Sequence, residues 1–254
     1  MANPQLHPLE VNPRTGEPFL RLRKHKNVIL TPPRSSDIPE NIRYLNDPHV
    51  NDMLSGPPVP YLLEHAEAWY KVISTPSEET LAAIEAARDM PDLITVRHCP
   101  VRVIREVKED GEDVFLGDIG LLRFDEGRLL APDGLQADDE QKAKYVNANI
   151  ERPVGDPEIV WSIGDYLAPS HHGRGIMTDV LETLLWDWAV PRMGVRRICA
   201  SAFEGNHGSI RVFERNGFTV TKTVENWAVV KGRMRNLHVV EWDYSTAVPP
   251  SGSS

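Results

Sequence analysis

The clearest chemical pattern in this sequence is a short loop with two glycines, placed between a strand-like segment and an amphipathic helix. Residues 169–176 read Pro-Ser-His-His-Gly-Arg-Gly-Ile. Gly173 and Gly175, two positions apart, let the backbone turn several N–H groups toward one point. That point lies at the positive end of the helix that follows, which favours an anion such as a pyrophosphate. Arg174 and the two histidines place further donors beside it.

A Gly-x-Gly pair alone is also typical of a tight turn that binds nothing, so it needs support from the rest of the chain. The nucleotide-binding pattern Gly-x-Gly-x-x-Gly is incomplete, because residue 178 is Thr. A nucleotide-dependent oxidoreductase would also need a parallel doubly wound sheet, and the hairpin signal near Gly111 argues against one. No His-Glu-x-x-His spacing occurs, and Cys99 and Cys199 stand far apart, so we expect no metal site.

Composition sets the broad class. The chain has 254 residues, 41% of them hydrophobic, which is enough for one large domain with appendages. Its net charge of −9 argues against a general nucleic-acid binder, which needs a basic face. Neither a secretory signal nor an apolar run long enough to span a bilayer is visible, and the two cysteines suit a reducing compartment. We therefore expect a cytoplasmic monomer or homodimer with no membrane or nucleic-acid partner.

The elements that must position the loop alternate between strands and helices along the chain. Residues 1–26 are rich in Pro, Asn and charge and predict an extended arm, and residues 245–254 predict a disordered tail. Residues 125–157 have no periodicity and form a long insert. Between these segments the patterns predict strands at 28–30, 101–107, 114–124, 158–167, 196–203, 218–224 and 237–242, and helices near 37–45, 60–73, 80–88, 176–188 and 206–216.

Several short motifs, in this order of elements, resemble the GCN5-related N-acetyltransferase (GNAT) superfamily. The likeness covers roughly residues 27–244 outside the insert. Two N-terminal motifs, at 45–48 and 60–61, look like the branch that acetylates ribosomal-protein N-termini and assorted small amines. The central motifs are Gly-Asp-Tyr-Leu-Ala-Pro at 164–169, His-Gly-Arg-Gly-Ile at 172–176, Asn-His-Gly-Ser at 206–209 and Phe-Glu-Arg-Asn-Gly-Phe at 213–218.

The resemblance implies an α/β (α+β) fold with a mixed central sheet of about six to seven strands, flanked by helices and splayed between the fourth and fifth strands. It implies an acetyltransferase domain over residues 27–244 that carries the insert. The activity implied is transfer of an acetyl group from acetyl-CoA to a primary amine, by direct attack in a ternary complex. The pantetheine arm of the co-substrate would enter between the two splayed strands.

The resemblance also implies a set of cofactor-binding residues. Backbone groups at 166–168 would meet the pantetheine arm, and the N–H groups of 172–178 would hold the pyrophosphate. Asn206 can equally be a helix cap, and Arg174 can equally be a solvated arginine. The full set is Tyr166, Leu167, Ala168, His172, Gly173, Arg174, Gly175, Ile176, Met177, Thr178, Asn206, Ser209 and Phe213.

The catalytic groups are less well marked in the sequence. Asp165 and Glu158 are candidate bases for the amine proton, but their odd spacing would point them to opposite faces of a regular strand. Ser209 is a candidate acid for the leaving thiolate. In the family the place of Phe213 often holds a Tyr acid, and that of Ser170 a Gln or Arg. These two departures keep a non-catalytic acyl-CoA-binding or interaction module as the alternative function.

The insert offers one more hypothesis. Residues 125–158 hold nine acidic and four basic residues. Because the insert leads into the fourth strand, a negative flap near the site would attract a cationic amine. A disordered, solvated loop is the equal alternative.

Overall fold

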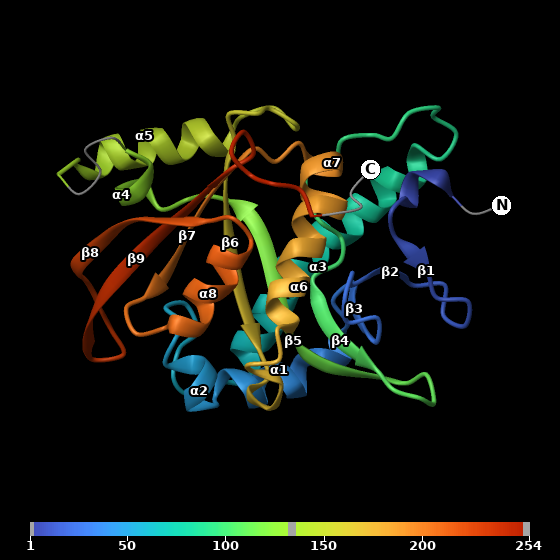
Figure 1. The fold of residues 1–254 in the computed structure, drawn as a ribbon, viewed down its shortest axis with the longest axis horizontal. Coiled ribbons are helices and arrows are strands. Elements are labelled where there is room, and N and C mark those ends of the chain that lie inside the picture. The colour runs from blue at the N-terminus through green and yellow to red at the C-terminus, as the bar shows by residue number, and fades with distance from the viewer. Residues whose placement is uncertain (1–2, 132–135, 251–254) are drawn as a thin grey trace.

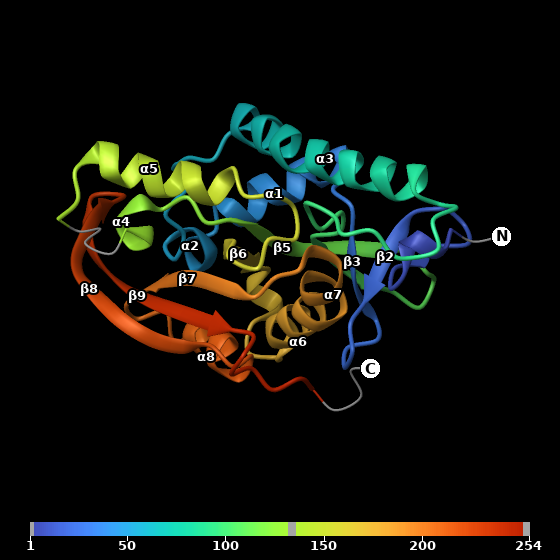
Figure 2. The ribbon, with the colours of Figure 1, turned by 90° about the horizontal axis from the view of Figure 1, so that it is seen from above.

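The computed structural model describes residues 3–131 and 136–250, and these form one mixed sheet with helices on both faces (Figures 1 and 2). Nine strands are present in the described part of the chain, against the expected six to seven. They are β1 (Glu10–Val11), β2 (Pro18–Arg21), β3 (Val28–Thr31), β4 (Val103–Val107), β5 (Asp113–Arg123), β6 (Val160–Leu167), β7 (Arg197–Phe203), β8 (Thr219–Val230) and β9 (Arg233–Asp243).

The strand order is β1-β2-β3-β4-β5-β6-β7-β9-β8, and every neighbouring pair is antiparallel except β6 with β7. The expected mixed sheet is thus confirmed. The two additional strands, β1 and β2, lie in the segment 1–26 that the sequence predicts as an extended arm. Within this segment, β2 pairs with β3. Phe19 and Leu20 of β2 are buried, so the segment is part of the folded sheet.

The sheet opens between β6 and β7, as the resemblance implies. β6 pairs with β5 along seven residue pairs but with β7 at Val160–Arg197 and Trp161–Ile198, the first residues of each strand. Beyond Trp161 the two parallel strands diverge. Gly117 of β5 allows the close approach on the other side of β6, because a Cβ there would lie 2.1 Å from the Tyr166 carbonyl oxygen.

The helices cover the two faces of the sheet separately. Figure 2 shows α3 and α5 on one side and α6, α7 and α8 on the other. The main core packs between the sheet and α6–α7, around Trp161, Trp188 and Trp242. The helices are η1 (Pro4–Leu6), η2 (Ser35–Asp37), α1 (Ile38–Leu45), α2 (Pro48–Asn51), α3 (Leu63–Ala86), α4 (Gly127–Leu130), α5 (Asp139–Ile150), η3 (Pro169–His171), α6 (Ile176–Thr183), η4 (Leu184–Ala189), α7 (Val190–Met193) and α8 (His207–Arg215).

The long insert contains α4 and α5, which its polar sequence does not predict. Asp138 caps α5 by accepting from the Gln141 N–H at 2.8 Å. Asn149 fastens the end of α5 by donating to the carbonyls of Phe124 and Val160, at 3.0 and 2.8 Å. Polar ties therefore hold this helix to the ends of β5 and β6. Residues 132–135 of the insert lie outside the described residues.

The predicted disordered tail, residues 245–254, lies partly outside the described residues, which end at 250. Within the described part, Ser245 donates its backbone N–H to Asp243 at 2.8 Å, and Ala247 packs against the main core.

Candidate active site

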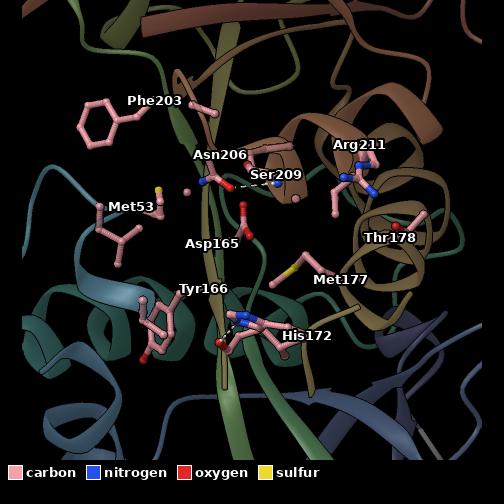
Figure 3. Close-up of a pocket in the computed structure, with 18 of the residues that line it drawn as sticks. Met53, Asp165, Tyr166, His172, Met177, Thr178, Phe203, Asn206, Ser209 and Arg211 are labelled. Atoms are coloured by element: carbon pink, nitrogen blue, oxygen red, sulfur yellow. Dashed lines mark hydrogen bonds between the residues drawn. The ribbon is translucent and has the colours of Figure 1, made fainter. Parts of the chain in front are cut away.

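A cleft of about 500 Å³ opens where β6 and β7 part. It has two halves, one on each face of the sheet. In Figure 3, Asp165, Asn206 and Ser209 lie in the middle. We call one side the α6–α8 half, after Gly173, Gly175, Met177, Thr178 and Arg211, and the other the α2–β9 half, after Val50, Met53, Leu54, Phe203 and Leu237.

The glycine loop forms one end of the α6–α8 half. Gly173 and Gly175 have φ of +73° and +77°, which only glycine adopts without strain, and a Cβ on either would meet no described atom within 4 Å. Gly175 is the N-cap of α6, and its carbonyl accepts the first intrahelical bond, from Asp179. The N–H groups of residues 176–178 precede that bond and point out of the helix start. The conformation of this backbone is compatible with the anion site that the sequence predicts.

The N-terminal segment braces this loop, which the sequence does not reveal. Asp179, 1% exposed, accepts from the backbone N–H groups of Lys24 and His25 and lies 2.7 Å from His25 Nδ1. His25 Nε2 lies 3.2 Å from the Arg174 carbonyl. The turn between β2 and β3 therefore fixes the start of α6.

Asp165 of β6 is the carboxylate in the centre of the cleft. It is half-buried. Burial raises the pKa of Asp165 to about 6, and the nearby Asp118 carboxylate adds to the shift. Asp118 is itself neutralised by Arg102, at 2.7 Å. Glu158, the second predicted base, lies before β6, is exposed, and does not line the cleft. The structure thus brings one of the two candidate bases to the site.

Asn206 and Ser209 begin α8 at the centre of the cleft. Asn206 Oδ1 accepts from the Ser209 N–H at 3.2 Å, so Asn206 is the helix cap, and it also lines the cleft. The two interpretations of Asn206 are therefore compatible. The Ser209 side chain faces the cleft together with Asn206 (Figure 3).

The open edge of β6 presents the backbone of Leu167. Ala168 donates its N–H to Leu116 of β5 at 2.6 Å, so the N–H of the preceding Leu167 points to the β7 side. His172 Nε2 lies 2.8 Å from the Leu167 carbonyl. The side chain of Tyr166 lines the cleft, and its hydroxyl accepts from Asn41 at 3.0 Å. Ala168 is fully buried and does not line the cleft.

Two further predicted residues do not reach the cleft. Phe213 is 1% exposed and packs on Phe218 with ring centroids 5.0 Å apart. The ring of Phe213 is therefore part of the core and does not line the cleft. The Arg174 side chain is exposed and does not line the cleft, although its carbonyl, which is part of the loop, contacts His25. The predicted residues that do line the cleft are Asp165, Tyr166, Leu167, His172, Gly173, Gly175, Ile176, Met177, Thr178, Asn206 and Ser209.

Several residues of the cleft were not predicted. Arg211 and Arg215, one turn apart on α8, both line the cleft and add positive charge to the α6–α8 half. Figure 3 shows Arg211 on the side of Thr178. The sequence held a signal for them, because Arg211 and Arg215 are spaced i, i+4 and so share one face of the helix that Asn206 caps. The residues of the α2–β9 half carry no local signal. None of the described residues of the insert lines the cleft; α4 packs behind it, through Leu129 and Leu130.

Residues 3–131 and 136–250 contain no group of three or more His, Cys, Asp or Glu that could hold a metal ion. They also contain no helix that is both long and apolar enough to cross a membrane.

The model of the acetyltransferase (GNAT) domain matches residues 27–219. The chain belongs to the GNAT acetyltransferase family. The family resemblance drawn from the motifs is therefore confirmed.

Individual GNAT proteins resemble the chain over different lengths. The probable N-acetyltransferase YjcK of Bacillus subtilis is 41% identical over 93 residues, which cover 33% of this chain and 51% of YjcK. The chain thus spans about half the length of this curated relative. Mycobacterium smegmatis RimJ, solved with a CoA-disulfide, shares the fold at 18% identity and a TM-score of 0.54, over 90% of this chain and 87% of RimJ. Spermidine N-acetyltransferase from Vibrio cholerae, solved with CoA and spermine, shares the fold at 12% identity and a TM-score of 0.53. This match covers 87% of this chain and 97% of the Vibrio protein.

Proposed function

We propose that this GNAT protein is an acetyl-CoA-dependent N-acetyltransferase that moves an acetyl group to a primary amine by direct attack in a ternary complex. The observation that carries the proposal is the cleft between β6 and β7. An N–H-rich helix start lies on one side of it, and a carboxylate with a raised pKa lies at its centre. The first suits a phosphorylated co-substrate, and the second suits removal of a proton from an amine.

The α6–α8 half is suited to the phosphate groups of acetyl-CoA. The N–H groups of residues 176–178 supply fixed donors at the positive end of α6. Arg211 and Arg215 add exposed positive charge to this half. The pantetheine arm would follow the open edge of β6, where the Leu167 N–H and the Asn206 carboxamide face the cleft.

At the centre of the cleft the neutral amine attacks, and its nitrogen forms a bond to the thioester carbon. The Asp165 carboxylate takes one proton from this nitrogen as the bond forms and later releases it to solvent. The Leu167 N–H faces the developing oxyanion. The C–S bond breaks, and the Ser209 hydroxyl gives a proton to the thiolate and regains one from solvent.

A base with a pKa of about 6 suits this work. At neutral pH the carboxylate is still deprotonated, yet it holds a proton more firmly than an ordinary aspartate does. Proton transfer is most effective when the pKa of the base lies near the working pH. Burial of Asp165 therefore improves it as a base.

Two measurements test the proposal. Acetyl-CoA should raise the melting temperature, and release of free thiol from acetyl-CoA should depend on an added primary amine. Asp165→Asn should keep the thermal shift and lose most of the amine-dependent thiol release. If acetyl-CoA binds but no amine in a broad panel releases thiol, the protein is instead the non-catalytic acyl-CoA-binding module.

A further inference from the structure

The α2–β9 half of the cleft is largely apolar, although it is open to solvent. Five of its side chains are hydrophobic: Val50, Met53 and Leu54 from α2 and the turn after it, Phe203 from the end of β7, and Leu237 from β9. His49 and Ser55, from the same segment as Met53, also line the cleft, but neither carries a negative charge. Met53 is 38% exposed, whereas Val50, Phe203 and Leu237 are buried. In Figure 3, Met53 and Phe203 lie on the same side of Asp165, opposite Met177 and Arg211. The attacking amine would therefore approach Asp165 past hydrophobic groups.

Acidic groups are scarce around this approach. Among the described residues that line the cleft, Asp165 is the sole carboxylate. The described acidic residues of the insert, on which the flap hypothesis depends, do not line it. A second ammonium on the same substrate would thus lose water without gaining a counter-charge.

The α2–β9 half is held in place from behind. Phe203 and Leu237 belong to a buried cluster against which Trp227 of β8 packs. The Arg128 guanidinium of α4 stacks 3.3 Å from the centre of the Trp227 ring. The insert therefore supports this half from outside the cleft, rather than contributing charge to it.

The β8–β9 hairpin also fixes the opposite wall. Lys231, at the tip, donates to Asn51 Oδ1 at 2.6 Å and to the Leu54 carbonyl at 2.9 Å. Arg235 donates to the Asp52 carbonyl at 2.9 Å. Both cations therefore donate to oxygens at and just after the end of α2, and neither is among the described residues that line the cleft. The hydrophobic wall that carries Met53 and Leu54 is thus preformed.

We propose that the preferred acceptor is a primary amine whose neighbouring group is uncharged and apolar, and that polyamines are poor acceptors. Such an amine can be an alkylamine or arylalkylamine, or a chain-terminal α-amine beside an apolar side chain. The amine reaches Asp165, while the apolar group packs on Met53, Leu54 and Phe203. This inference rests on the proposed function, because it assumes that Asp165 receives the amine proton.

The first experiment measures kcat/KM at saturating acetyl-CoA for n-propylamine to n-hexylamine, phenethylamine and spermidine. Burial of each added methylene should raise kcat/KM by roughly fourfold until the α2–β9 half is filled. Phenethylamine should exceed spermidine by about tenfold or more, because spermidine carries charges that nothing in the cleft meets. Two tripeptides distinguish a peptide chain end from a small amine as the acceptor. The kcat/KM for Leu-Ala-Ala should exceed that for Asp-Ala-Ala, because the leucine side chain is apolar. The ratio of kcat/KM for Leu-Ala-Ala to that for n-hexylamine then indicates which of the two kinds of acceptor fits better.

Variants locate the effect within the cleft. Met53→Ala should lower kcat/KM for n-hexylamine by about fourfold or more, the loss expected for at least one buried methylene group, with no change in the KM for acetyl-CoA. Met234→Ala is the matched control, since Met234 is 55% exposed on β9 and does not line the cleft. Leu54→Asp adds a carboxylate to the α2–β9 half and should raise kcat/KM for spermidine.

The outcomes separate this inference from the proposed function. A wild-type preference for spermidine over phenethylamine would overturn the inference alone, as would equal effects of Met53→Ala and Met234→Ala. An acetyl-CoA thermal shift without turnover of any amine would overturn the proposed function and the inference with it.

Discussion

The two halves of the cleft are built in opposite ways. The α6–α8 half is built mainly on the backbone of residues 173–178, which Gly173 and Gly175 shape, with Arg211 and Arg215 of α8 beside it. The α2–β9 half consists of side chains from three segments that are distant in sequence, around Met53, Phe203 and Leu237. A backbone site can bind a phosphate group with little dependence on side chains, whereas a side-chain site determines what else can bind. Changes in the first half should therefore affect binding of acetyl-CoA, and changes in the second half should affect the choice of amine.

The largest effect is expected from Gly175→Ala. Its methyl group projects into the open space that an anion on the helix start would occupy, so the acetyl-CoA thermal shift and amine-dependent turnover should both be abolished. Gly16→Ala is the matched control: Gly16 has φ of +74° and equally open surroundings in the turn between β1 and β2. Both variants should lose about 1 kcal/mol of stability from the left-handed backbone. A normal thermal shift in Gly175→Ala would remove the loop from the cofactor site.

Asp165→Asn should give the next largest effect, on chemistry rather than on binding. Loss of the base should lower kcat by about 10²–10⁴-fold, while the acetyl-CoA thermal shift persists. In the wild type, the pH profile of kcat/KM should contain a limb with a midpoint at about 6, below which activity falls as Asp165 is protonated. The variant should lack this limb. Glu158→Gln, the same change at an exposed position outside the cleft, should retain both rate and profile.

The same pKa has a consequence for stability. The native Asp165 carboxyl holds its proton up to about pH 6, whereas an unfolded aspartate releases it near pH 4. Between these two pH values the native state therefore binds more protons than the unfolded state does. The free energy of unfolding consequently falls as pH rises through this range. Asp165→Asn should consequently melt at a higher temperature than the wild type above pH 6, and this advantage should vanish below about pH 4. Urea unfolding at several pH values measures the difference.

Most of the α6–α8 half could be predicted from the sequence, because its signals are local. A strand at 158–167 and a helix starting at 176 were expected, and β6 (Val160–Leu167) and α6 (Ile176–Thr183) match them closely. The cap at Asn206 was likewise expected. Such signals depend on turn conformation, helix ends and periodicity within a few residues. Phe213 shows the limit, because a motif does not reveal which face of a helix is buried.

The remaining features depend on contacts between distant segments. α3 runs unbroken through Pro76, where two separate helices were expected, because its buried residues Ile73, Ser77 and Ile84 continue along one face. α5 is held by polar ties that periodicity cannot detect. The α2–β9 half was missed altogether, since nothing near Met53 or Leu237 in sequence relates one to the other. Only the folded sheet brings them together.

Ser209→Ala should have a smaller effect than Asp165→Asn. A thiolate is a fair leaving group, so loss of its acid should lower kcat by about tenfold, below the usual range for such catalysis. The cap should survive, because it uses the backbone N–H of residue 209, and the melting temperature should stay close to that of the wild type. Turnover at the wild-type rate would assign protonation of the thiolate to water. A rise in the KM for acetyl-CoA without a change in kcat would make Ser209 a binding residue instead.

The smallest effect is expected from Lys231→Met, which tests whether the hairpin positions the α2–β9 half. Burial lowers the pKa of Lys231, but its three bonds to oxygens of Asn51 and Leu54 keep the ammonium in place. Methionine retains the stem and loses these bonds, so the end of α2 should loosen and Met53 should be held less firmly.

For this variant we expect the KM for the amine to rise by about threefold, since the apolar wall would have to order on binding, with the KM for acetyl-CoA unchanged. Amide hydrogen exchange over residues 48–55 should quicken even without substrates. Lys222→Met, on the exposed face of β8, should change neither quantity. Because the exchange measurement does not depend on catalysis, unchanged exchange in Lys231→Met would show that α2 holds its own position. The two halves of the cleft would then differ in composition but not in how firmly they are built.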